Sequence, residues 1–155
     1  MPAHDEPINL ARSITVSLEL QHSAKTVWEA LADLSSHPVW MKDAIEISFR
    51  THQTRGQGTL MDVATRIGPF RTTDVIEVVR WVDESKIEIV HRGVITGRGV
   101  LSVEPGGGRS IVTWVEFLHF PWWLGGRLAT WLARPFLRSI WRANLTRLDQ
   151  TLSDR

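Results

Sequence analysis

The sequence predicts an α+β protein in which one antiparallel sheet has helices on one side. Two observations predict this class. One strand and a short helical region come first, six further strand-like segments follow in series, and a long helical stretch ends the chain. The separators between the strand-like segments are only a few residues long, and such short connections join antiparallel neighbours because parallel strands need a long crossover.

Composition narrows the class further. The chain has 155 residues, 43% hydrophobic and 23% charged, as expected for a single globular domain with a substantial core. A net charge of +1 gives no general attraction to nucleic acid, and the absence of cysteine excludes disulfides and thiolate metal sites. Eight tryptophans without a tyrosine indicate a large apolar interior.

We expect a cytoplasmic protein, because no apolar run is long enough to cross a membrane. Residues 1–11 are polar, contain two prolines and lack the apolar core of a signal peptide. We therefore expect residues 1–11 to be a disordered or loosely attached segment, followed by one domain over residues 12–155.

The spacing of apolar residues and a helix-capping residue predict the first strand and the two short helices. Arg12 to Gln21 alternates apolar and polar residues, which predicts a strand with one buried face. Ser23 is a suitable N-cap for a helix over Ala24 to Leu34. A further helical turn is expected over Pro38 to Met41, so that two short helices follow the first strand.

After these helices the apolar period changes to two. The expected strands lie over Ile45 to Phe49, Thr59 to Arg66, Phe70 to Trp81, Lys86 to Arg92, Gly97 to Glu104 and Ser110 to His119. With the first strand they make seven, and several of the separators contain glycine.

The stretch from Phe117 to Leu152 predicts the long C-terminal helix. Its apolar residues recur every three or four positions, but the stripe is centred on Leu128 before Pro135 and on Leu148 after it, roughly half a turn away. Either Pro135 kinks one helix, or a short helix precedes a longer one that begins near Pro135. A bent helix across a curved sheet would bury both stripes.

These elements together resemble the START-like, Bet v 1-like superfamily (SRPBCC), in particular its bacterial polyketide cyclase/dehydrase branch. The resemblance covers roughly residues 13–152. It depends on Ser23-Ala24-Lys25-Thr26-Val27-Trp28, Pro38-Val39-Trp40, Gly56-Gln57-Gly58, Gly97, Gly99, the glycines at 106–108 and Val112-Thr113-Trp114. It implies a helix-grip fold, in which a seven-stranded antiparallel sheet wraps around the long C-terminal helix and leaves an apolar cavity.

Most catalytic patterns are absent from the sequence. It contains no nucleophile elbow, zinc-protease motif, phosphate loop or dinucleotide fingerprint, and its six histidines show no metal-ligand spacing. We therefore expect no metal and no cofactor. Gly97-Arg98-Gly99 lies among strands with no helix after it, so a bulge or a close backbone approach explains its glycines better than a phosphate site does.

His91 and Glu116 are the only pair that we nominate for acid–base chemistry. His91 shares a strand face with Ile87 and Ile89, which predicts that it points inward, either as a functional group or as a core histidine satisfied by a carbonyl. On the last strand we favour Trp114, Glu116 and Leu118 as the inward residues, whereas Val115 and Phe117 favour the opposite face, on which Glu116 would be solvated. An inward Glu116 would be desolvated, which raises a carboxyl pKa unless a cation pairs with it.

Other polar positions are less informative. Asp62 either points into the cavity or forms a surface pair with Arg66, and Asp74 is interpreted as structural. The full set of expected ligand-binding residues is Trp28, Trp40, Asp62, Ile89, His91, Trp114, Glu116, Phe117, Trp122, Leu128 and Trp131.

The segment from Phe117 to Gly126 has several interpretations. It caps the sheet, or Trp122 and Trp123 form a mobile lid over the cavity. With arginines nearby, the two tryptophans could also make a transient membrane contact, and a homodimer contact would explain them equally well.

The function expected from these features is carriage of a hydrophobic small molecule, such as a lipid, isoprenoid or polyketide, without nucleic acid as a partner. The enzyme alternative is a polyketide cyclase, aromatase or dehydratase, for which the resemblance implies cavity polar groups that position a poly-ketone chain and assist enolisation and loss of water. The third hypothesis is a protein-interaction module with a filled cavity. Because START-like folds serve many functions, the enzyme name of the branch is weak evidence for catalysis, and we favour carriage.

Overall fold

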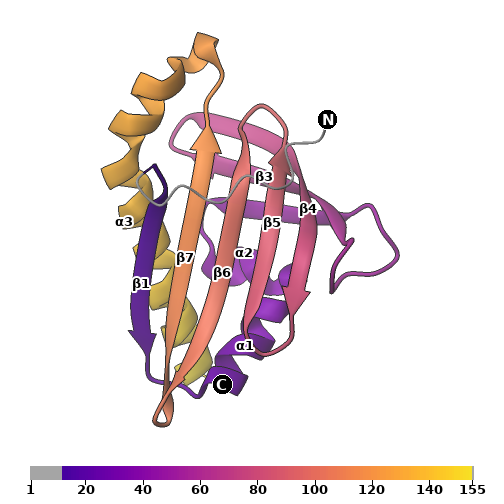
Figure 1. Ribbon diagram of the computed structural model, residues 1–155, viewed down its shortest axis with the longest axis vertical. Helices are drawn as coiled ribbons and strands as arrows, with labels where there is room; N and C mark the ends of the chain where they lie inside the picture. The colour runs from indigo at the N-terminus through magenta and orange to yellow at the C-terminus, as the bar shows by residue number, and fades with distance from the viewer. Residues whose placement is uncertain (1–11, 155) are drawn as a thin grey trace.

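The computed structural model describes residues 12–154, which form one seven-stranded antiparallel sheet curved around a long C-terminal helix (Figure 1). The strands are β1 (Ile14–Leu20), β2 (Ala44–Phe49), β3 (Leu60–Ile67), β4 (Phe70–Val82), β5 (Lys86–Arg92), β6 (Thr96–Gly106) and β7 (Arg109–His119). The helices are α1 (Ala24–Ala32), α2 (His37–Trp40) and α3 (Gly126–Ser153), with 3₁₀ turns η1 (Leu34–Ser36) and η2 (Trp122–Leu124). The expected loose segment at residues 1–11 lies outside the described residues.

The strand order is β1-β7-β6-β5-β4-β3-β2, so that β2 through β7 form a meander and β1 pairs with β7 at the far edge. Two short helices follow β1, and α3 packs against β1 and β7. The α+β class, the seven antiparallel strands and the helix-grip arrangement predicted from the sequence are confirmed.

Helix α1 begins where its capping residue predicts. The Ser23 hydroxyl accepts a hydrogen bond from the Thr26 backbone N–H at 3.2 Å, which satisfies one of the free donors of the first turn. Its inward residues include Val27, Trp28 and Leu31, all buried. The helix closes one end of the sheet (Figure 1).

Helix α3 is continuous through Pro135, so the alternative of two separate helices is wrong. Figure 1 shows that the helix changes direction along its length. The second apolar stripe, which includes Trp141 and Leu145, is buried, whereas Leu128 and Trp131 of the first stripe are exposed. The expectation that both stripes are buried is therefore wrong, because the first turns of α3 extend past the end of the sheet (Figure 1).

Among the helices of residues 12–154, none has a run of apolar residues long enough to cross a membrane.

Candidate functional site

A cavity of about 180 Å³ lies between the sheet and α3, and it is partly open to solvent. Its walls are mainly aliphatic and aromatic side chains from β2 through β7, α2 and α3. The apolar lining includes Met61, Val63, Ile76, Ile87, Ile89, Leu101, Trp114, Leu118, Leu137 and Trp141. The polar side chains that reach it are His37, Asp43, Thr65, Thr72, Asp74, His91 and Glu116.

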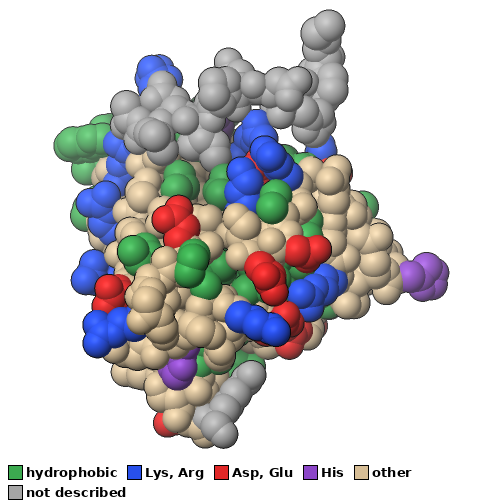
Figure 2. All heavy atoms as spheres, turned by 60° about the horizontal axis from the view of Figure 1, so that its bottom comes forward, with side chains coloured by type: hydrophobic (Ala, Val, Ile, Leu, Met, Phe, Trp, Pro, Cys, Tyr) green, Lys and Arg blue, Asp and Glu red, His purple; other side chains and the backbone are tan. Residues whose placement is uncertain are grey.

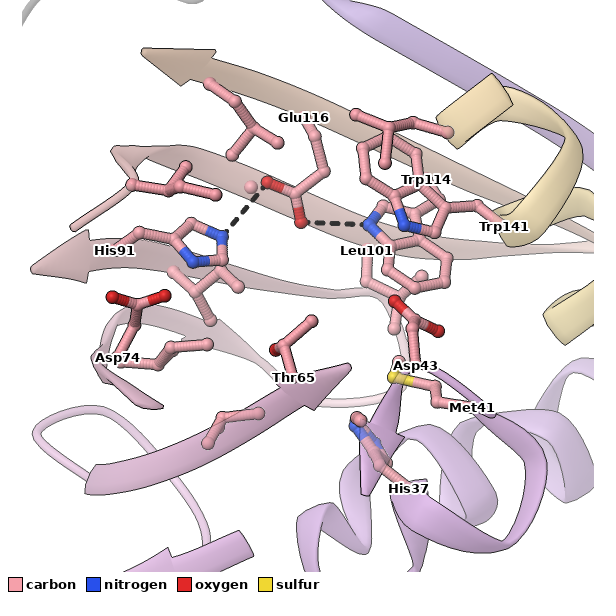
Figure 3. Close-up of a pocket in the computed structure, with 18 of the residues that line it drawn as sticks. His37, Met41, Asp43, Thr65, Asp74, His91, Leu101, Trp114, Glu116 and Trp141 are labelled. Atoms are coloured by element: carbon pink, nitrogen blue, oxygen red, sulfur yellow. Dashed lines mark hydrogen bonds and ion pairs between the residues drawn. The ribbon is translucent and has the colours of Figure 1, made fainter. Parts of the chain in front are cut away.

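His91 and Glu116 meet in this cavity although their strands are not neighbours (Figure 3). Strand β6 lies between β5 and β7, and its Gly97 and Gly99 stand opposite His91 and Glu116 respectively. Since these two positions of β6 have no side chain, the imidazole and the carboxylate extend over the strand. His91 Nε2 lies 3.1 Å from Glu116 Oε2.

Gly99 leaves room for the Glu116 carboxylate in this position. A Cβ atom at position 99 would lie 2.6 Å from Glu116 Oε1, closer than real Cβ contacts come. The sequence interpretation of Gly97-Arg98-Gly99 as a close backbone approach is confirmed, because a Cβ at Gly97 would also meet the Phe117 carbonyl oxygen at 2.0 Å.

Glu116 is held on its other side by the indole of Trp114, whose Nε1–H donates to Oε1 at 3.0 Å. The two residues are separated by two positions on β7 and therefore point to the same face. Trp114 in turn stacks on Trp141 of α3, with ring centroids 5.3 Å apart. The carboxylate thus sits in a fixed place, 3% exposed and bonded by two donors when His91 is protonated.

The charge state of His91 follows from its surroundings. Burial lowers the pKa of His91, but the charge of Glu116, the hydrogen bond to it and the charge of Asp74 together raise the pKa above its usual value of 6.5. These surroundings therefore favour the protonated form of His91, which faces the carboxylate of Glu116 inside a mainly apolar cavity.

Asp74 supplies a second buried carboxylate, on the opposite side of the His91 ring from Glu116 in Figure 3. It accepts hydrogen bonds from the Thr72 hydroxyl at 3.0 Å and from the Val94 backbone N–H at 2.8 Å. The turn after β5 approaches closely only because Gly93 lacks a Cβ, which would lie 1.8 Å from Asp74 Oδ1. Two glycine–carboxylate contacts thus flank His91.

The other end of the cavity contains a neutral histidine and a tethered carboxylate. His37 Nε2 lies 2.8 Å from the Leu31 carbonyl oxygen, and burial lowers the pKa of His37 to about 4 despite that bond and the nearby charge of Asp33. Asp43 accepts a hydrogen bond from the amide of Asn144, a fully buried residue of α3.

The arrangement supports general acid–base chemistry or hydrogen bonding to a ligand. A protonated His91 donates a proton or a hydrogen bond, and Glu116 accepts one, both within an apolar enclosure. Within residues 12–154, no group of three or more His, Asp or Glu side chains is placed to hold a metal ion.

The structure brings together four of the predicted site residues: Ile89, His91, Trp114 and Glu116 all line the cavity. The inward orientation of His91 and Glu116 predicted from alternation is therefore correct, and so is the preference for Trp114 over Val115 as the inward residue.

The other seven predicted ligand-binding residues do not line the cavity, so the expectation that they do is wrong. Trp28 packs edge-on against Trp81 at 5.4 Å, in the core beneath α1. Trp40 lies behind the cavity wall, with its ring 6.4 Å from that of Trp114. Asp62 and Phe117 fall on the outer face by strand alternation.

On that outer face, Asp62 forms a bidentate pair with Arg50, at 2.8 and 2.7 Å, rather than with Arg66. The ring of Phe117 lies edge-on against that of His119, with centroids 4.5 Å apart. Trp122, Leu128 and Trp131 do not line the cavity and are 87%, 65% and 63% exposed.

Sequence reasoning missed Asp74, His37 and Asp43 as cavity residues. Asp74 had a usable signal, because it shares a strand face with Ile76 and Val78, both buried. His37 and Asp43 had none, since they lie in a short helix and a turn whose side-chain directions depend on tertiary packing.

Solved structures with the same architecture cover nearly the whole chain. A START superfamily protein from Mycobacterium smegmatis superposes with a TM-score of 0.73 at 14% identity, over 90% of this chain and 98% of that one. The Zhui aromatase/cyclase from a Streptomyces species superposes with a TM-score of 0.70 at 14% identity, over 93% and 94%. At such identities the likeness shows the fold alone. No curated protein matches the chain.

The family assignment comes from the sequence. Residues 11–153 match the family model described as polyketide cyclase / dehydrase and lipid transport, which spans almost the entire chain. The chain therefore belongs to the polyketide cyclase / dehydrase and lipid transport family.

Proposed function

We propose that the protein binds and carries a hydrophobic small molecule in this cavity, with a polar atom of the ligand held at the His91–Glu116 pair. The observation that carries the proposal is the buried His91–Glu116 pair in a mainly apolar cavity that is partly open to solvent. The family, whose description includes lipid transport, supports the same class of ligand.

The ion pair indicates what the ligand must contain. Burying two charges costs several kcal/mol per ion unless hydrogen bonds satisfy the groups that remain. A pure hydrocarbon would remove water from His91 and Glu116 and replace none of its hydrogen bonds. A ligand with an apolar body and at least one hydroxyl, carbonyl or carboxyl oxygen satisfies both parts of the cavity.

The size of the cavity is consistent with a small molecule. Its volume of about 180 Å³ is over ten times the smallest space that holds one water, which is about 10–15 Å³. Fatty acids, isoprenoid alcohols and flavonoids are suitable probes because each joins an apolar body to a polar group.

The enzyme alternative is favoured by one specific observation. His91 has a raised pKa and lies 3.1 Å from a carboxylate in a mainly apolar site, which is how an acid and a base are arranged for enolisation or loss of water. The aromatase/cyclase that shares this fold supports testing a poly-ketone substrate.

Binding and turnover assays on His91→Ala and Glu116→Gln separate carriage from catalysis. A carrier loses affinity for the hydrophobic probes modestly in both variants and shows no turnover of a poly-ketone. An enzyme loses turnover by roughly 10²–10⁴-fold. Glu19→Gln is the matched control, because Glu19 forms an exposed ion pair with Arg109 on the outer face.

Carriage is wrong if folded wild-type protein binds none of the probes, and this outcome favours an interaction module. If instead both variants retain full affinity for every probe, the cavity pair has no role in holding the ligand.

A further inference from the structure

Exposed apolar side chains gather at one end of the molecule, the upper end in Figure 1. We call this end the upper rim; it comprises the β3–β4 turn, the β5–β6 turn, η2 and the first turns of α3. Its exposed apolar side chains are Phe70 at 69%, Val94 at 42%, Trp122 at 87%, Trp123 at 59%, Leu128 at 65%, Trp131 at 63%, Leu132 at 60% and Phe136 at 57%. Large exposed apolar side chains gathered at one end of a molecule usually mark a contact site.

The same rim adjoins the cavity. Ile67, Ile95 and Phe120 line the cavity, and each lies next to one of the rim segments in the chain. These three are partly exposed, whereas Leu34 and Leu137, which line deeper parts, are buried. A molecule that enters the cavity past these three residues therefore passes the exposed apolar surface.

The charge of the rim has one sign. Residues 120–136, which cover η2 and the first turns of α3, contain Arg127 and Arg134 and no acidic residue, and Arg127 is exposed among the apolar side chains of α3. Arg66 and Arg71 are exposed cross-strand neighbours at the β3–β4 hairpin. Within residues 12–154, Arg66, Arg71 and Arg127 form no ion pair. By contrast, Figure 2, which brings the opposite end forward, shows acidic and basic side chains interspersed.

We propose that the upper rim docks on the surface of an anionic lipid bilayer, with the cavity entrance facing the lipid. Tryptophan prefers the interface between headgroups and acyl chains, and nearby arginines are attracted to anionic headgroups. A second copy of the chain fits less well, because a two-fold contact through the rim places its arginine-rich surface against itself. Docking rests on the rim alone, while ligand exchange with the bilayer rests on the proposed function.

Flotation with vesicles tests the docking. We expect binding to vesicles of roughly 70% phosphatidylcholine and 30% phosphatidylglycerol, weak binding to pure phosphatidylcholine, and loss of binding at high salt. Trp122→Ser with Trp123→Ser should weaken binding at least about tenfold, because both indoles leave the interface. The matched control is Val39→Ser with Ile111→Ser, two apolar side chains outside the rim that are 57% and 39% exposed.

A second variant tests the arginines. Arg66→Gln with Arg71→Gln should lower the binding constant for the anionic vesicles about fivefold per arginine, since each arginine near an anionic surface raises that constant about fivefold. Both pairs of positions are exposed, so the variants keep the fold, and circular dichroism checks this.

The docking is overturned by absence of vesicle binding, by equal binding to neutral and anionic vesicles, or by equal losses in the tryptophan and control variants. A concentration-dependent dimer that the tryptophan variant abolishes, without vesicle binding, assigns the rim to a second copy instead. Probe binding in solution is measured without vesicles. If the protein binds no probe in solution but still binds the vesicles, the proposed carriage is therefore rejected and the proposed docking is supported.

Discussion

Replacing Glu116 with glutamine should destabilise the protein in a strongly pH-dependent way. Glutamine keeps one acceptor for the Trp114 N–H, now 3.0 Å from Oε1, but its amide nitrogen cannot accept from a protonated His91. A hydrogen bond to a charged group contributes about 1.5–3 kcal/mol. For a protein of this length that loss lowers the melting temperature by about 3–12 °C.

The pH dependence follows from the pKa of His91, which is raised above 6.5 in the folded protein. Protonated His91 therefore stabilises the folded protein fully at a pH below its unfolded-state pKa of 6.5. This contribution is lost as the pH rises through the higher pKa of His91 in the folded protein. When His91 is neutral, the glutamine amide donates to its Nε2, so the variant is again satisfied. The penalty should be largest near about pH 6 and fade toward about pH 9.

Urea denaturation at both pH values measures this difference. Glu19→Gln, which alters an exposed pair, should change stability by less than about 1 kcal/mol at either pH. A Glu116→Gln penalty that is equal at the two pH values, or larger at the higher one, would refute the assignment of a charged His91 paired with Glu116.

Three further outcomes are expected. In Gly99→Ala the new Cβ would lie 2.6 Å from the Glu116 carboxylate and displace it, so the change should lower the free energy of unfolding by about 1–3 kcal/mol and lower the pKa of His91 in NMR titration. Gly106→Ala should cost less, because its Cβ would make only an ordinary contact at 3.7 Å. Because the pKa of His37 is lowered to about 4, the free energy of unfolding should fall by up to about 3 kcal/mol as the pH falls from 6.5 to 4. In His37→Gln, urea denaturation should show a smaller fall over this pH range, and an unchanged fall would contradict the buried neutral form of His37. Trp141→Ala should cost about 3–5 kcal/mol because the ring is 5% exposed, and Trp123→Ala, 59% exposed, should melt near the wild type; equal losses in calorimetry would contradict the assigned burial.

Strand alternation predicted the strands of the sheet and favoured an inward orientation for His91 and Glu116. His91 follows Ile87 and Ile89 on one face of β5, and Glu116 follows Trp114 on one face of β7. Short glycine-rich separators required antiparallel neighbours, and seven such strands followed by a long helix allow few arrangements. Local pattern and global fold agree at these positions.

The sequence could not show which side chains of non-adjacent strands contact one another. That His91 meets Glu116 depends on two glycines of the strand between them, and single-strand periodicity contains no information about registry across three strands. The contacts of Asp74 could not be predicted for a related reason, since one of its partners is a backbone N–H of a turn twenty residues away in the chain.

Tryptophan enrichment was a poor guide to the cavity wall. Trp28 and Trp40 are almost fully buried, but they fill the core under the helices rather than the cavity. Trp122 is exposed because the chain leaves the sheet at η2, and a helical period cannot indicate where a sheet ends. A large apolar side chain reports burial or contact, and only the arrangement of the elements separates the two.

Native mass spectrometry of the purified protein, compared with its denatured mass and with an Ile89→Trp variant, tests the central claim most directly. Ile89 lines the cavity, and an indole at that position occupies part of its volume. The account predicts that the wild type retains, or takes up from the probe panel, one hydrophobic molecule with a polar group, and that the variant does not. A wild-type protein that stays empty with every probe, or a variant that binds as well as the wild type, would contradict it.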